Sequence, residues 1–148
     1  MGVGLWSRKD AFAQQRTLSI IGNDVLVASP TSKKEFRFWS LSNTATIPNQ
    51  GCCSCWEKME CLATTSDGIF CAGGTVLGKI YIWETTSGAM LRYWDAHYSV
   101  VTVLAFNEDN LCLVSVENHA YIRVWKLAQV LDVSDKAWAK QPEAFHVF

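Results

Sequence analysis

The residues whose type and spacing come closest to a chemical site are three cysteines in one short segment, Cys52, Cys53 and Cys55. Cys52 and Cys55 have the C-x-x-C spacing of zinc and redox sites. A structural zinc ion takes four ligands, and no second pair follows at a suitable spacing. We therefore expect a loop with free thiols and no metal site, and keep metal binding or redox chemistry of the Cys52–Cys55 cluster as the alternative.

Histidine is the next candidate, because an imidazole beside a serine or cysteine can act as the base of a nucleophilic site. Of the three histidines, His97 lies in the most regular part of the sequence. Nucleophilic catalysis also needs a third group that orients the base, and no such trio is apparent. The sequence therefore predicts a structural histidine, no catalytic residue, no enzyme activity and no cofactor.

The charged residues do not form a strong patch. Glu108 and Asp109 fit a solvated turn better than a catalytic carboxylate pair. Lys33, Lys34 and Arg37 form a small basic spot, which fits a hairpin tip because so few charges give little affinity for phosphate. The formal net charge of the 148 residues is −1, so we expect neither sequence-specific binding of nucleic acid nor attraction to a membrane.

The expected cellular compartment follows from the lack of a membrane-spanning run and of a secretory signal in the sequence. Its longest apolar run, Val103-Leu104-Ala105-Phe106, extended by Val100-Val101 across Thr102, is far too short to span a bilayer. Residues 1–10 do not have the basic and apolar regions of a secretory signal. Without such a signal, six cysteines do not imply disulfides, and a reducing compartment, nucleus or cytosol, is expected.

Three tryptophans, Trp39, Trp83 and Trp125, recur at nearly equal intervals along the chain. Each closes a short alternating run, as in Ile80-Tyr81-Ile82-Trp83 and Ile122-Arg123-Val124-Trp125. A repeat of about 40–45 residues that contains such strands is typical of a β-propeller blade. The predicted fold class is all-β, a partial propeller of about three four-stranded blades.

Turn residues divide the repeats into short runs of β-formers. We expect strands at 18–21, 25–29, 35–41, 59–63, 69–74, 79–84, 89–94, 100–106, 111–116, 121–126 and 144–148, with a weak outer strand within the loop 42–56 and a helical turn at 127–132. The predicted units are an N-terminal segment without clear periodicity (1–16), a degenerate blade (17–56), a blade (57–96), and a blade with an insertion near 132–142 (97–148).

These residues carry a resemblance to the WD40-repeat family. Ala96-His97 stands where that family has Gly-His, Ser115 at its Ser/Thr position, and Trp125 at the closing Trp. The resemblance implies a buried hydrogen-bonded set of His, Ser, Trp and Asp. Here the Asp position falls on His119, and on Leu77 one repeat earlier, so we expect a weakened set. The implied structural blade residues are Trp39, Trp83, Trp125, His97 and Ser115.

The number of repeats has a consequence for the assembly. Propellers close with about four to eight blades, because closure removes exposed strand edges. The resemblance therefore implies a fragment of a seven-bladed ring, completed by other sequence or by another chain, with self-association through open edges. A non-functional truncated product is the alternative.

A narrower resemblance rests on residues 78–84, on Ala96-His97-Tyr98, and on residues 122–127 running into Val130-Leu131-Asp132. These segments resemble the WD40 subunit of the nuclear complex that matures large ribosomal subunit precursors and works with the Midasin AAA-ATPase. This resemblance implies a scaffold in large-subunit maturation and pre-rRNA processing, with ribosome-assembly factors and the pre-ribosomal particle as partners.

In WD40 propellers the loops at one end of the blades bind protein partners. The corresponding residues here are Thr75, Val76, Leu77, His97, Tyr98, Glu117, Asn118 and His119. The implied location is the nucleus, in nucleolus or nucleoplasm, with the cytoplasm as alternative. Two other functions stay open: a generic WD40 adaptor in ubiquitin ligation or signalling, and an enzyme built on a propeller, which would need polar groups converging on an axial pocket.

Overall fold

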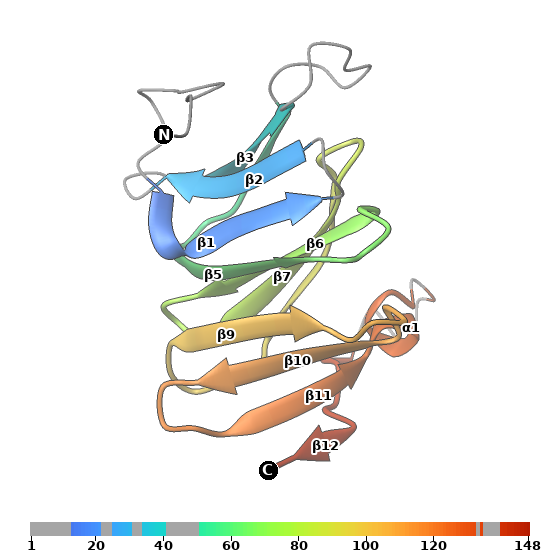
Figure 1. The fold of residues 1–148 in the computed structure, drawn as a ribbon. Coiled ribbons are helices and arrows are strands. Elements are labelled where there is room, and N and C mark those ends of the chain that lie inside the picture. Colours follow the sequence, from blue (N-terminus) through green and yellow to red (C-terminus); the bar gives the residue numbers. More distant parts are fainter. Residues whose placement is uncertain (1–12, 22–24, 31–33, 41–50, 133, 135–139) are drawn as a thin grey trace.

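The chain forms three four-stranded antiparallel sheets, one after another in sequence (Figure 1). The computed structural model describes residues 13–21, 25–30, 34–40, 51–132, 134 and 140–148. In each sheet the strands follow chain order, because each strand turns back on the one before it. The three sheets lie one above another in Figure 1, so every sheet after the first packs on its predecessor.

The first sheet contains β1 (Ala13–Ile21), β2 (Val25–Pro30), β3 (Glu35–Ser40) and β4 (Gly51–Ser54). Its pairing is antiparallel throughout, with Leu26 opposite Trp39 and Phe36 opposite Cys53. For most of this sheet only the backbone is described. The pairing of β3 with β4 shows that residues 51–54 supply the outer strand expected within the 42–56 segment.

The second sheet contains β5 (Met59–Thr64), β6 (Phe70–Thr75), β7 (Lys79–Glu84) and β8 (Met90–Asp95). The four central residues of β7 are fully buried on both faces of the sheet. This agrees with their sequence, Ile-Tyr-Ile-Trp, which has no polar alternation. A sheet covered on both faces must lie between two other layers.

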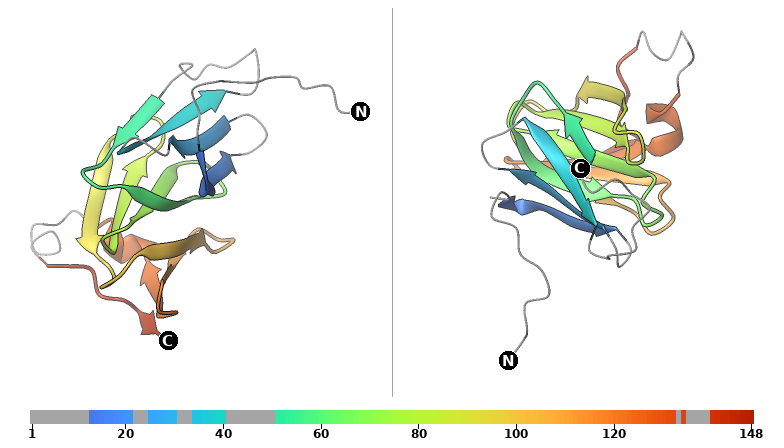
Figure 2. Two further views of the ribbon diagram at one scale, coloured as in Figure 1. Left: turned by 90° about the vertical axis from the view of Figure 1, so that its left-hand side faces the viewer. Right: turned by 90° about the horizontal axis from the view of Figure 1, so that it is seen from above.

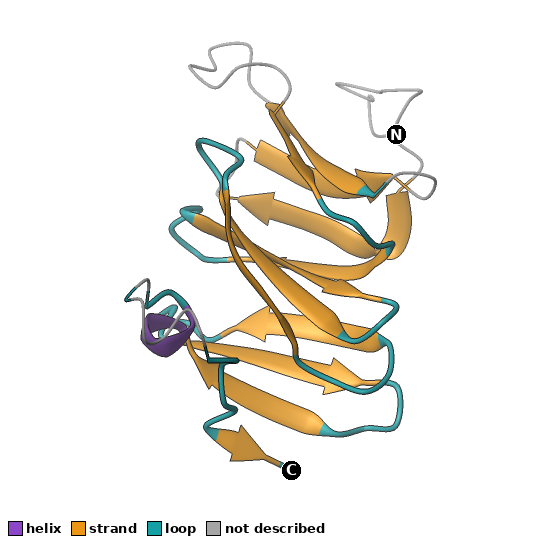
Figure 3. Cartoon of the chain, turned by 180° about the vertical axis from the view of Figure 1, so that it is seen from behind, coloured by secondary structure: helices purple, strands orange, loops and turns teal. Residues whose placement is uncertain are grey.

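The third sheet contains β9 (Val101–Phe106), β10 (Cys112–Glu117), β11 (Ile122–Lys126) and β12 (His146–Val147). A single helical turn, α1 (Leu127–Val130), follows β11 directly. Figure 3 shows the loops gathered at the two ends of the sheets, with α1 at one of them. None of the helical segments in the described ranges has the length and apolarity needed to cross a membrane.

The first strands of the three sheets lie side by side. β5 contacts β1 on one side and β9 on the other, while β4, β8 and β12 lie at the opposite edges of their sheets. Figure 2 shows the sheets fanning out from the row formed by β1, β5 and β9. This radial arrangement is the one that the sequence repeat requires, since each repeat must place its first strand next to the previous one.

The core between the second and third sheets is made of apolar side chains from both. Ile80, Ile82 and Trp94 pack against Leu113 and Trp125, all nearly or completely buried. The Trp94 and Trp125 rings meet edge to face, with centroids 5.3 Å apart. A second cluster on the opposite face of the second sheet contains Cys55, Met59, Leu62, Cys71, Tyr81 and Trp83.

The structure confirms the all-β class and the four-stranded antiparallel sheets. β1 begins at Ala13, before the boundary expected at residue 17, and the blade boundaries themselves stay a prediction. The described strands otherwise start and end close to the expected positions. The side chains of two sheets, β5–β8 and β9–β12, are described well enough to examine as blades, and the assignment of a third belongs with the proposals below.

Candidate functional site

His97, Ser115 and Trp125 meet inside the third sheet although they come from different elements. His97 precedes β9, Ser115 is in β10 and Trp125 ends the apolar run of β11. The Trp125 indole Nε1 donates to Ser115 Oγ at 2.8 Å, and His97 Nε2 lies 2.7 Å from the same oxygen. All three side chains are buried, so each hydrogen bond satisfies a group that water cannot reach.

Glu117 supplies the carboxylate that the sequence does not offer at His119. Its Oε2 lies 3.4 Å from His97 Nδ1 and accepts from the backbone N–H of Tyr98 at 3.2 Å. The Glu117 side chain is only 4% exposed. A carboxylate at the end of β10 therefore holds the start of the Tyr98 loop and faces the ring of His97, slightly earlier in the chain than the motif predicts.

The protonation of His97 follows from its surroundings. Burial lowers the pKa of His97, and the nearby positive charge of Arg123 lowers it further, while Glu117 acts in the opposite direction. The ring is therefore neutral at pH 7. A neutral ring with its proton on Nδ1, toward Glu117, accepts the Ser115 hydroxyl proton at Nε2, and that hydroxyl oxygen accepts from Trp125.

This set is structural and lacks the parts of a nucleophilic centre. The oxygen of Ser115 is buried and already engaged by His97 and Trp125, so no substrate atom can approach it. Glu117 brings a carboxylate to the imidazole from the end of β10, but His97 Nδ1 is buried and forms no hydrogen bond with it at 3.4 Å. The expected weakening of the set stays a prediction.

The second sheet has different side chains at the positions of this set. When the two repeats are aligned on Trp83 and Trp125, Cys55 stands at the position of His97 and Gly73 at that of Ser115. A Cβ placed on Gly73 would meet Met59 Sδ at 2.5 Å and the Trp83 ring at 3.1 Å. A serine does not fit there. Met59 fills the space that the polar set occupies in the third sheet.

The expected partner face divides into buried and exposed residues. Thr75, His97 and Glu117 are buried and hold the loops in place, and Val76 is half-buried. Tyr98 is 95% exposed and Leu77 65% exposed, and Asn118 and His119 are exposed as well. Only these four of the eight residues have side chains that a partner can contact.

Backbone hydrogen bonds hold the loops of this face together. Gly78 O accepts from the N–H groups of Ala96 and His97 at 3.1 and 2.9 Å, which ties the β6–β7 turn to the β8–β9 connection. Asn118 N donates to Val100 O at 3.0 Å. Residues 76–78, 96–100 and 118–121 therefore form one continuous end of the molecule, which we call the loop face.

A second polar cluster joins the two strand ends that flank residues 76–78 of the loop face. Glu57 accepts from the Thr75 hydroxyl at 2.7 Å and forms an ion pair with Lys79 at 2.9 Å. The Glu57 side chain is 11% exposed, so the ion pair is largely shielded from water. The hydrogen bond and charge of Glu57 raise the pKa of Lys79, which keeps it charged. The sequence offered no sign of this cluster, because Glu57 lies between two strands outside any motif.

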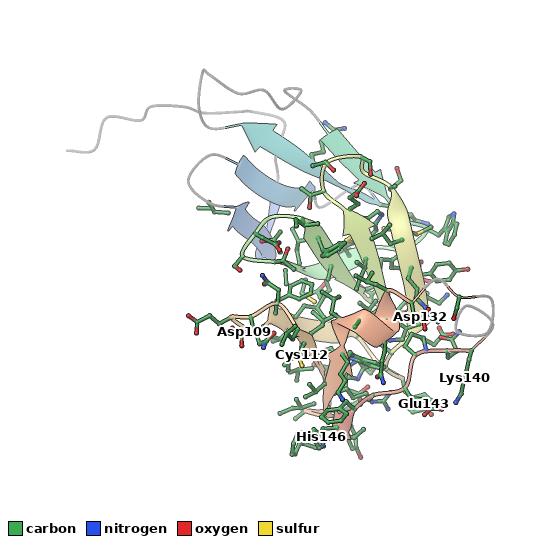
Figure 4. The ribbon with its side chains drawn as sticks, turned by 90° about the vertical axis from the view of Figure 1, so that its right-hand side faces the viewer. Asp109, Cys112, Asp132, Lys140, Glu143 and His146 are labelled. Carbon is green, nitrogen blue, oxygen red and sulfur yellow. The ribbon has the colours of Figure 1, made fainter. Side chains whose placement is uncertain are left out.

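Arg92 was also not predicted from sequence. It is a buried cation on β8, and its guanidinium donates to the carbonyl oxygens of Val130, Asp132 and Lys140 at 3.1, 3.4 and 2.6 Å. A shallow pocket of about 230 Å³ lies beside it, lined also by Gln129, Gln141, Pro142 and Glu143. Figure 4 shows Asp132, Lys140 and Glu143 near α1. Arg92 thus anchors both ends of the expected insertion near 132–142 to the second sheet.

The cysteines lie apart from one another where they are described. Cys55 donates to Glu57 O at 2.8 Å, and burial raises the pKa of its thiol, which makes it a poor nucleophile. Cys61, Cys71 and Cys112 are thiols rather than disulfide partners. Within the described residues, no three His, Cys, Asp or Glu side chains gather as metal ligands would. The side chains of Cys52 and Cys53, and residues 31–33 and 41–50, lie outside that description.

Comparison with known proteins gives relatives of one kind. The chain is 40% identical over 76 residues to ROOT INITIATION DEFECTIVE 3 of Arabidopsis thaliana, covering 51% of this chain and 17% of the relative. It is 38% identical over 80 residues to the pre-rRNA-processing protein IPI3 of Mycosarcoma maydis, covering 54% and 14%. WD repeat-containing protein 18 of Bos taurus is 24% identical over 147 residues, covering 99% and 33%. The chain thus spans at most a third of the length of these relatives.

Solved structures share the fold at low sequence identity. A chain of the mitotic checkpoint complex superposes with a TM-score of 0.70 at 13% identity, covering 95% of this chain and 39% of that one. U3-55K superposes with a TM-score of 0.69 at 18% identity, covering 91% and 40%. No protein-family model matches the sequence. The chain is thus related in sequence to IPI3, WD repeat-containing protein 18 and ROOT INITIATION DEFECTIVE 3.

Proposed function

We propose that the chain is a non-catalytic scaffold of ribosome biogenesis that acts in large-subunit maturation and pre-rRNA processing in the nucleus. The observation that carries this function is the relation to proteins named for pre-rRNA processing. The structure supports the scaffold role, because His97, Ser115 and Trp125 form a closed buried set that fixes a loop instead of exposing a reactive group.

We further propose that the three sheets are three successive blades of a seven-bladed ring. Each sheet has four antiparallel strands, and the first strands β1, β5 and β9 are neighbours, as in a propeller. The units 17–56, 57–96 and 97–148 each contain one sheet, apart from the first residues of β1. The remaining blades come from further sequence or from another chain.

The proposed partner surface is the loop face, with ribosome-assembly factors or the pre-ribosomal particle as partners. Tyr98 is the anchor, since large exposed aromatic side chains dominate protein interfaces. Leu77, Asn118 and His119 are also exposed in the loops of this face and add apolar and polar side chains to it. The buried Thr75, His97 and Glu117 set the position of these loops without contacting the partner.

The test is affinity capture from nuclear extract with the tagged chain, followed by measurement of pre-rRNA and assembly factors. We expect enrichment of large-subunit precursors, and a loss of at least tenfold when Leu77 and Tyr98 are both changed to Asp. The matched control changes Leu111 and Ile69, which are exposed at the other end of the sheets, to Asp. Capture of ubiquitin-ligase or signalling proteins without precursors would instead assign the generic adaptor function.

A further inference from the structure

A cluster of three aromatic side chains lies partly open near β8, the last strand of the second sheet, on the face opposite the third sheet. Tyr81 on β7 and Tyr93 on β8 face each other across the strands as stacked rings, with centroids 5.4 Å apart. Trp56, just before β5, meets Tyr93 edge-on at 5.1 Å and Tyr81 at 6.2 Å between centroids. Trp56 is 60% and Tyr93 42% exposed, whereas Tyr81 is fully buried. We call these three residues the aromatic patch.

The exposed carboxylate at the patch, that of Asp95, can accept hydrogen bonds from a donor outside the chain. The Tyr81 hydroxyl is buried and has no hydrogen-bond partner among the described residues. Burial raises the pKa of this hydroxyl, so it remains uncharged. Asp95 follows Tyr93 on the same face of β8, and its side chain is 69% exposed. The faces of Trp56 and Tyr93 are also negative, because of the aromatic quadrupole.

Lys79 lies near the patch but does not neutralise Asp95. Lys79 pairs with Glu57 at 2.9 Å and lies 4.0 Å from Asp95, at the limit of an ion pair. Glu57 and Asp95 together carry one more negative charge than Lys79 balances. Lys58 is exposed close to Trp56 in the sequence and is the competing positive charge.

The third sheet shows which chemical group packs against an exposed aromatic ring at the position equivalent to Trp56. In the same alignment of the two repeats, Tyr98 corresponds to Trp56 and Arg123 to Tyr81. There the guanidinium carbon of Arg123 lies 5.7 Å from the centre of the Tyr98 ring. The exposed aromatic that precedes the third sheet therefore has an arginine of its own chain beside it, whereas none of the described residues places a cation over the ring of Trp56.

We propose that the aromatic patch and Asp95 bind an arginine side chain of a protein partner. The guanidinium lies against the exposed rings of Trp56 and Tyr93, and its N–H groups donate to the Asp95 carboxylate. Arginine suits the site better than lysine, because its planar group can stack on aromatic rings and donate in a fork at the same time. This inference rests on the proposed scaffold function in one respect, namely that the binding partner is a protein.

The experiment titrates the whole isotope-labelled chain with a capped glycine–serine peptide that carries two arginines. Matched peptides carry two lysines or two glutamates. We expect the arginine peptide to shift the indole resonance of Trp56 and the amides of Tyr93 and Asp95, and the glutamate peptide to leave them in place. Tyr93→Ala weakens the association by about two- to fivefold, the range of one cation–π contact at an exposed site. Asp95→Asn weakens it by up to about fivefold, the range of one exposed ion pair.

The matched control is Lys58→Ala, which removes an exposed charge beside Trp56 and leaves or strengthens arginine binding. Because Tyr93 also stacks on Tyr81, Trp56→Ala serves as a second variant that removes only an exposed ring, and we expect it to abolish the shifts at Tyr93. Equal shifts with the glutamate peptide, or unchanged binding by both Trp56→Ala and Asp95→Asn, would overturn the proposal. Peptide binding does not depend on ribosomal precursors, so its failure is distinct from failure of the proposed function.

Discussion

At the scale of single residues, the third sheet keeps most of a polar core set after the loss of one motif residue. Ser115 joins two side chains that would otherwise be buried without partners, and Glu117 at the end of β10 places a carboxylate 3.4 Å from His97 Nδ1. The second sheet instead has Met59 packed on Gly73 at the equivalent place. Removal of a further partner from the third sheet is costly, because an unpaired buried polar group costs the full desolvation penalty.

Replacement of Ser115 by Ala should therefore destabilise the fold more than the loss of one hydrogen bond suggests. The change leaves both the Trp125 indole N–H and His97 Nε2 without their partner, and we expect the free energy of unfolding to fall by about 1–3 kcal/mol. Urea unfolding followed by tryptophan fluorescence measures this. Ser54→Ala, at an exposed position of β4, is the control and should stay within about 0.5 kcal/mol of the original protein.

His97 gives the stability a dependence on pH. Its pKa in the folded chain is lowered, chiefly by burial, from the ordinary value near 6.5. Just below that value the unfolded chain binds the proton more readily than the folded chain does, so the free energy of unfolding falls as the pH falls. We expect the loss to begin near pH 6.5 and to continue until the folded-state pKa is passed, with a slope of at most about 1.4 kcal/mol per pH unit.

Urea titrations at pH 7.5, 6.5 and 5.5 measure this slope. His97→Gln should remove it, whereas His146→Gln, which changes an exposed histidine, should preserve it. If both variants keep the full pH dependence, acidic groups elsewhere must be responsible.

At the scale of elements, the sequence predicted most strands closely, because three levels of pattern agree: the tryptophan period, the β-forming runs and the turn residues between them. The contacts between elements could not be read in the same way. Glu117 is the last residue of β10, one position beyond the strand end that the sequence predicts. Arg92 on β8 donates to the carbonyl oxygens of Val130 and Lys140, which lie far from it in the sequence. Periodicity places strands, but it does not show which side chains meet across loops.

The turns that join the second and third strands of the second and third sheets each contain a residue with positive φ. Gly78 has φ of 88° in the β6–β7 turn, and Ala120, at the equivalent position of the next repeat, has φ of 67°. The left-handed conformation costs an alanine about 1–2 kcal/mol, while glycine adds about 0.4–1 kcal/mol of unfolded-state entropy.

Ala120→Gly should therefore stabilise the chain by about 0.5–1 kcal/mol, as measured by the urea midpoint at constant slope. The Ala120 side chain is exposed, so its removal loses little packing. The reverse change, Gly78→Ala, should destabilise strongly, since its Cβ would collide with the carbonyl oxygen of His97. An unchanged midpoint for Ala120→Gly would show that the turn relaxes without strain.

At the scale of the whole molecule, the third sheet has one face directed away from the second sheet, which we call the outward face. Its residues correspond to those with which the second sheet packs on the third. Ile80, Ile82 and Ala72 are fully buried against the third sheet, and the residues at the same positions of the next repeat are Ile122, Val124 and Val114. On this outward face Val103 is 47%, Ile122 37% and Phe148 71% exposed. A sheet with apolar side chains on both faces requires a layer on each side.

This open face predicts self-association of the chain, because exposed apolar surface and unpaired strand edges both favour contact with a second copy. We expect sedimentation velocity to show dimers or larger species that grow with concentration. The double variant Val103→Lys with Ile122→Lys should shift the distribution to the monomer, because two charges on the face cannot be buried without partners. Both positions lie on the solvent side of their strands, so the circular dichroism spectrum should stay the same. Leu77→Lys, which places a charge on the loop face, should leave the association intact, and a monomeric original protein at all concentrations would contradict the prediction.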